Sequence, residues 1–74
     1  MNYYPGDVIQ VIHRDSGMQF PECKVYLQDE TDHVIYLMGA TWHVKSDEEF
    51  DSLYPQFVLK VIKKVQVGED EDAT

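Results

Sequence analysis

The dipeptide Gly39-Ala40 constrains the fold of this chain most, because it joins two short segments of β-forming residues. A glycine in the first of two turn positions favours a type II′ hairpin turn, which would place Met38 opposite Thr41. In that register the side chains alternate between the two faces of the hairpin. The core face would carry Ile35, Leu37, Trp42 and Val44, and the outer face would carry Val34, Tyr36, Met38, Thr41, His43 and Lys45.

Two further strands are predicted near the ends of the chain. Pro5-Gly6 suits the middle of a type II turn, and residues 8–13 follow it with many β-branched side chains. Apolar residues occur on both faces of this segment, so its buried face stays open. Residues 57–67 are also β-branched, with Phe57, Leu59 and Val61 on one face.

Residues 23–28 show the alternation of a half-buried strand, and Cys23, Val25 and Leu27 are predicted to point inward. If this strand pairs with the hairpin, its inward residues must lie directly across from Ile35 and Leu37, which are on the core face. That arrangement requires a three- or five-residue loop or a β-bulge near residues 29–33.

A short helix is predicted after the hairpin. Ser46 and Glu49 have the spacing of a capping box, and the acids between them favour the positive end of a helix dipole. Pro55 ends the helix after about two turns. Its apolar stripe would consist of Phe50, Leu53 and Tyr54.

These elements predict a mainly β fold: a small five-stranded antiparallel barrel or a strongly bent sheet, with one short helix between strands 4 and 5. The order of strand, long loop at residues 14–22, three-strand meander, helix and strand resembles that of small SH3-like barrels, including Tudor-type and KOW-type modules. The sequence pattern of peptide-binding SH3 domains is absent, because Trp42 is the only tryptophan and no Ala-Leu-Tyr-Asp-Tyr segment occurs. A five-stranded OB-like barrel or a sheet with one packed helix stays open.

With 74 residues the chain is predicted to form one domain over residues 1–67, followed by a disordered acidic tail at residues 68–74. Cys23 is the only cysteine, so an internal disulfide is impossible and a reducing cytoplasm fits best. No run approaches the roughly 20 apolar residues of a membrane span, so we expect no membrane contact.

Fourteen acidic and six basic side chains give a formal charge of -8. We therefore expect no direct nucleic-acid binding, because affinity for a phosphate backbone comes from Lys and Arg. Lys60, Lys63 and Lys64 nevertheless form a local basic patch. The acids are clustered in three groups: Asp29, Glu30 and Asp32; Asp47, Glu48, Glu49 and Asp51; and Glu69, Asp70, Glu71 and Asp72.

No enzymatic site is predicted. Cys23 lies in phase with core residues, and a buried neutral thiol is a poor nucleophile. The three histidines, His13, His33 and His43, lack the spacing of known metal sites. We expect no catalytic residues, no metal and no cofactor.

The outer face of the hairpin is the first candidate site, because Val34, Tyr36 and Met38 beside His43 are more apolar than a solvent-facing surface requires. This face predicts a non-enzymatic protein-binding module or small accessory subunit that binds a protein partner or a second copy. The same face would also result if another segment packed over it.

The alternative function is nucleic-acid mimicry. Compact acidic proteins, including small phage-encoded inhibitors, can present carboxylates spaced like phosphates to a basic DNA- or RNA-binding enzyme. Here the acidic surface would consist of Asp29, Glu30, Asp32, Asp47, Glu48, Glu49 and Asp51.

Overall fold

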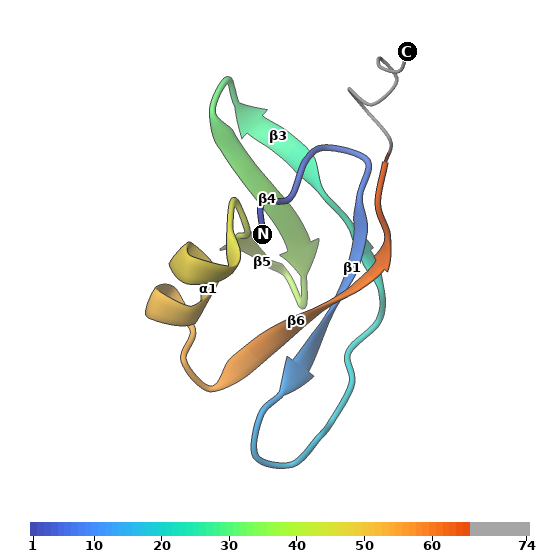
Figure 1. Cartoon of the computed structure of the whole chain (residues 1–74), viewed down its shortest axis with the longest axis vertical. Helices are drawn as coiled ribbons and strands as arrows, with labels where there is room; N and C mark the ends of the chain where they lie inside the picture. The colour runs from blue at the N-terminus through green and yellow to red at the C-terminus, as the bar shows by residue number, and fades with distance from the viewer. Residues whose placement is uncertain (66–74) are drawn as a thin grey trace.

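The computed structural model describes residues 1–65 (Figure 1). The predicted acidic tail, residues 68–74, and the last two residues of the predicted strand 57–67 lie outside this range. The described residues form six strands and one helix in two antiparallel sheets, with strand orders β2-β1-β6 and β3-β4-β5. The elements are β1 (Val8–His13), β2 (Cys23–Lys24), β3 (Tyr26–Asp29), β4 (Asp32–Leu37), β5 (Ala40–His43), α1 (Asp47–Leu53) and β6 (Phe57–Lys63).

The predicted five-stranded barrel or strongly bent single sheet is wrong. The described residues form two three-stranded sheets without a closed barrel, and the helix follows β5 instead of lying between strands 4 and 5. The strand count differs because residues 23–29 are interrupted at Val25. The Val25 amide donates to the Asp7 carbonyl over 2.8 Å, and the Val25 carbonyl accepts from the Gly6 amide over 2.9 Å. One segment thus supplies an edge strand to each sheet.

The hairpin forms as predicted, but its turn lies one residue earlier. Leu37 pairs with Ala40, and both turn residues, Met38 and Gly39, have positive φ angles of 57° and 73°. Two positive φ angles are typical of a type I′ turn, whose twist matches that of the flanking strands. Ile35 consequently pairs with Trp42. The partner of each residue shifts by two positions, so the division into two faces is preserved.

The bulge predicted between the second and third strands is confirmed. Leu27 pairs with His33, but Asp29 pairs with Asp32, so the register shifts between these pairs. Val25 is fully buried as predicted, whereas Leu27 is 46% exposed. The prediction that Leu27 points into the core was wrong, because the tip of the β3–β4 hairpin projects beyond the core, at the upper left of Figure 1.

The core lies between the two sheets and the helix. Ile9 and Val11 are the buried residues of β1, which settles the face that alternation left open. The predicted face of β6 packs against this core. The buried cluster consists of Tyr3, Ile9, Val11, Val25, Ile35, Leu37, Val44 and Phe50.

The helix begins as predicted, since the Glu49 amide donates to the Ser46 hydroxyl over 3.1 Å. Phe50 is buried and Tyr54 half-buried, but Leu53 is 50% exposed, so that member of the predicted stripe was wrong. A helix of only seven residues presents a narrow face to the core, and Leu53 lies outside it. Trp42 packs against the aromatic rings of this region, Phe50, Tyr54 and Phe57.

Asp7 is a fully buried carboxylate that alternation did not predict. It accepts hydrogen bonds from the Tyr4 amide at 2.9 Å, the Val65 amide at 2.8 Å and the Lys64 ammonium at 2.7 Å. Burial alone would raise the pKa of Asp7, but the hydrogen bonds from Lys64, Val65 and Tyr4 outweigh it, so the pKa lies below its usual value. The charged carboxylate therefore links the N-terminal turn to the chain just after β6.

Replacing this carboxylate should destabilise the fold. We expect Asp7→Asn to lower the free energy of unfolding by about 2–3 kcal/mol near neutral pH, because Lys64 loses its partner while remaining partly exposed. The folded pKa of Asp7 is lowered, so its contribution is present above about pH 4 and is lost as pH falls through the lowered value. Urea denaturation of both proteins across this range measures the difference.

Asp51→Asn is the matched control, because it removes an exposed ion pair with Arg14. It should cost at most about 1 kcal/mol. Equal losses in the two variants would contradict the role assigned to Asp7.

Candidate functional site

The outer face of the β3-β4-β5 sheet carries a pair of exposed tyrosines. Val34 on the central strand lies between Tyr26 on β3 and His43 on β5, and Tyr36 lies opposite Thr41 in the next row of the same face. Tyr26 and Tyr36 are therefore diagonal neighbours across two strands, close enough for large side chains to meet one partner.

The structure separates the four residues predicted for this face. Tyr36 and Met38 are 61% and 62% exposed, whereas Val34 is fully buried and unavailable to a partner. Tyr26 is 41% exposed and was missing from the predicted site. The alternation within residues 23–28 already placed Tyr26 on the outer side of its strand, but only the register with β4 brings it beside Tyr36.

His43, the fourth predicted residue, is held by internal contacts. Its Nδ1 atom lies 3.0 Å from the Asp32 carboxylate, and its backbone amide donates to the Tyr54 hydroxyl over 3.0 Å. The Gln28 side-chain amide donates to the same carboxylate over 3.2 Å. His43 thus contributes to the edge of the face and is less available than the tyrosines. We call Tyr26, Tyr36 and Met38 the tyrosine face.

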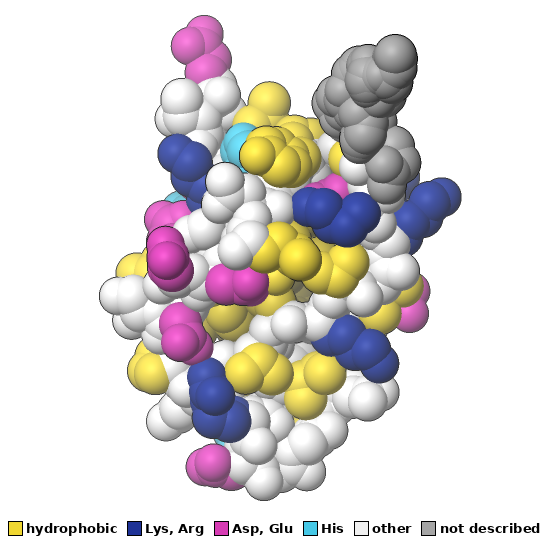
Figure 2. Space-filling view, viewed as in Figure 1, with side chains coloured by type: hydrophobic (Ala, Val, Ile, Leu, Met, Phe, Trp, Pro, Cys, Tyr) yellow, Lys and Arg dark blue, Asp and Glu magenta, His cyan; other side chains and the backbone are white. Residues whose placement is uncertain are grey.

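The seven residues of the predicted acidic surface occupy two separate regions. Figure 2 shows acidic side chains at the tip of the β3–β4 hairpin and beside α1, while most Lys and Arg side chains lie along β6 and toward the right. Two of the seven predicted acids have internal ion partners, Asp47 the N-terminal ammonium and Asp51 the Arg14 guanidinium, and Asp32 lies 3.0 Å from His43 Nδ1. Within residues 1–65 no ion pair forms at the other four, which are Asp29, Glu30, Glu48 and Glu49.

Asp47 also has a structural role. It accepts a hydrogen bond from the hydroxyl of the buried Tyr3. Burial, followed by the hydrogen bond and charge of Asp47, raises the pKa of Tyr3, so this phenol stays neutral. The Asp47 amide in turn donates to the Met1 carbonyl over 3.1 Å. These contacts hold the N-terminal segment against the start of α1.

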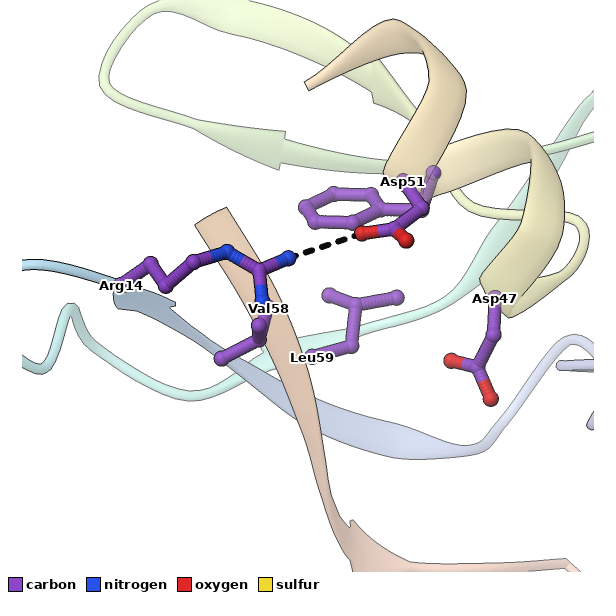
Figure 3. A pocket seen from close by; sticks show the side chains of 6 residues that line it. Arg14, Asp47, Asp51, Val58 and Leu59 are labelled. Carbon is purple, nitrogen blue, oxygen red and sulfur yellow. Dashed lines mark hydrogen bonds and ion pairs between the residues drawn. The ribbon is translucent and has the colours of Figure 1, made fainter. Parts of the chain in front are cut away.

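A pocket of about 300 Å³ lies between α1 and β6 (Figure 3). The Arg14–Asp51 ion pair, with a distance of 2.9 Å, lies at one side of it, and Phe50, Val58 and Leu59 supply apolar lining. The lining contains no Ser, Cys, His or Lys side chain. Its ionisable side chains are Arg14, Asp47 and Asp51, of which Arg14 and Asp51 are paired with each other.

Cys23 is half-buried, and its thiol donates weakly to the carbonyls of Pro21 and Tyr36, at 3.5 and 3.7 Å. Burial raises the pKa of the Cys23 thiol, which disfavours the reactive thiolate. Among the described residues no group of three or more potential metal ligands comes together. None of the helices described here has the length and apolar character needed to cross a membrane.

Comparison of the chain with protein-family models, curated proteins and solved structures finds no match to any of them. The function must therefore be argued from the surface chemistry itself.

Cys23 should react slowly in the folded protein. We expect the native thiol to react with an aromatic disulfide reagent at least about tenfold more slowly than the urea-unfolded chain at the same pH, because burial limits both access and thiolate formation. Absorbance of the released thiolate measures both rates. Equal rates would contradict the structural role of Cys23.

Proposed function

We propose that this chain is a non-enzymatic protein-binding module that contacts its partner through the tyrosine face. The carrying observation is that Tyr26 and Tyr36 project from adjacent paired strands of one sheet while remaining 41% and 61% exposed. Tyrosine is enriched among residues that dominate binding energy, because its ring buries a large apolar area and its hydroxyl can form a hydrogen bond.

The strands beneath this face support a preformed binding surface. Val34 lies between Tyr26 and His43 in one row of this face and is fully buried, so the base of the face is closely packed. A partner would then meet two large side chains on a rigid sheet, which reduces the entropy lost on binding. Because Cys23 is the only cysteine, a reducing compartment such as the cytoplasm fits this proposal.

The charge at the hairpin tip indicates the kind of partner. Asp29 and Glu30 follow Tyr26 on the same hairpin, are exposed, and form no ion pair within residues 1–65. Uncompensated acids at the rim of an apolar patch favour a partner with basic residues around an apolar pocket. The proposed partner is therefore a protein with a basic surface.

Nucleic-acid mimicry stays a prediction. Its seven acids are divided between the hairpin tip and α1; two of them pair with cationic groups of the chain itself, and Asp32 lies against His43. That arrangement leaves two small acidic regions instead of one continuous row of carboxylates, so the tyrosine face carries the proposal.

Removing one ring should disrupt binding without unfolding the domain. Captured from native lysate on immobilised protein, the partner should be retained by the wild type and lost with Tyr36→Ala, since truncating such a residue costs about 2 kcal/mol or more, roughly a thirtyfold weaker affinity. Tyr26→Ala should show the same loss. Circular dichroism of each variant checks the fold.

Met18→Ala is the control, because Met18 is 57% exposed in the loop between β1 and β2. It should retain the partner. If the tyrosine variants also capture the same proteins as the wild type, the tyrosine face is not the binding surface.

Two double variants that each remove two negative charges distinguish steering by the acids at the hairpin tip from nucleic-acid mimicry. Asp29→Asn with Glu30→Gln should slow association with the captured partner by about threefold to tenfold at low salt, because these acids steer a basic partner toward the tyrosines. Glu48→Gln with Glu49→Gln changes the net charge equally on α1 and should have a smaller effect. Surface plasmon resonance at two salt concentrations measures both, and a stronger effect of the α1 pair would favour mimicry.

A further inference from the structure

The outer face of the other sheet, β2-β1-β6, brings together three lysines from distant parts of the chain. Val8 pairs with Lys24 on one side and with Lys63 on the other, while Gln10 pairs with Lys60. Residues opposite one another in antiparallel strands project to the same face, and so do residues two apart in a strand. Lys24, Lys60 and Lys63 therefore share one face, which we call the lysine face.

These lysines have no ion partner within residues 1–65, although the chain as a whole is strongly acidic. Lys64 behaves differently, since it turns to the buried Asp7 carboxylate. The sequence patch of residues 60, 63 and 64 is thus rearranged by the fold: Lys64 leaves it and Lys24 joins it.

Aliphatic side chains lie among the lysines. Ile12 pairs with Val58 on the same face as Gln10 and Lys60, and both are half-buried. Ile62 is 38% exposed at the irregularity where β6 shifts register against Val8. Lysines on edge strands can serve only to prevent pairing with the strands of another molecule, but that role does not require exposed apolar side chains between them. The combination is that of a binding surface with an apolar centre and a cationic rim.

We propose that the lysine face binds an acidic, extended protein segment that carries aliphatic residues between its carboxylates. Lys24 and Lys63 flank the β1 strand, so their backbones are about 10 Å apart, which is two strand spacings. Carboxylates three residues apart in a segment of polyproline II conformation lie on one side of it and are separated by about the same distance, because this conformation has three residues per turn and rises about 3.1 Å per residue. Such a segment can pair with both lysines while its aliphatic side chains contact Val8, which lies between the two lysines, and Ile62 beside Lys63.

A protein segment fits this face better than a nucleic acid. A chain of net charge -8 repels a long polyanion as a whole, and three lysines release few counterions from a phosphate backbone. An acidic peptide carries fewer charges and gains apolar contact with the aliphatic side chains, which phosphates cannot provide. The lysine face thus lies on a different sheet from the tyrosine face and has the opposite charge preference.

The test uses the full chain and a labelled 16-residue peptide that repeats Asp-Glu-Val-Ser. Fluorescence anisotropy at low salt should detect binding of the wild type. Replacing all three lysines, with Lys24→Gln, Lys60→Gln and Lys63→Gln together, should weaken binding at least about tenfold, and Lys60→Gln alone should weaken it about twofold to fivefold.

Lys45→Gln is the matched control, since it removes one exposed lysine outside this face and should leave the affinity unchanged. The proposal is overturned if no peptide binding occurs up to about 1 mM, a free energy of only about -4 kcal/mol. It is also overturned if the triple variant binds as the wild type does. Tighter binding of a labelled oligo-dT strand than of the peptide overturns it in favour of nucleic acid.

Discussion

The buried carboxylate of Asp7 connects more of this fold than any other described side chain. The backbone carbonyl of the same residue accepts a hydrogen bond from the Val25 amide, at the point where residues 23–29 pass from one sheet to the other. Its side chain accepts from the Tyr4 amide in the N-terminal turn and from Lys64 and Val65 after β6. A carboxylate can be kept charged without water only if such donors replace the lost hydration. The N-terminal turn and the chain after β6 must therefore both be in place for this carboxylate to be satisfied, while the backbone of the same residue holds the segment at Val25.

This arrangement determines which surfaces the protein presents. Because residues 23–29 are interrupted at Val25, the two sheets share a chain segment yet keep separate outer faces. One outer face carries two tyrosines near unpaired acids at the hairpin tip, and the other carries three lysines among aliphatic side chains. The lysine face joins Lys24 from β2 to Lys60 and Lys63 from β6, while Lys64 is bound to Asp7.

The local elements were predictable where neighbouring residues alone decide them. The Ser46 cap depends on a contact three residues away, and the bulge after Leu27 follows from matching two alternating patterns. The division into two sheets and the exact position of the hairpin turn were not predictable, because both depend on strand twist and on pairing between distant residues. A turn at Gly39-Ala40 and one at Met38-Gly39 preserve the same two faces, so alternation cannot distinguish them. Leu27 and Leu53 are apolar in phase with the core, yet they lie where the core ends.

The candidate site divides in the same way. Alternation by itself determined that Tyr36 and Tyr26 face outward from their strands and that Cys23 does not. Only the tertiary structure decided that the two tyrosines are neighbours, that Val34 is buried beside them on the same face, and that Lys24 joins Lys60 and Lys63. The physical reason is that a strand's period of two fixes the face of each side chain, whereas its neighbours depend on which strands pair and in which register.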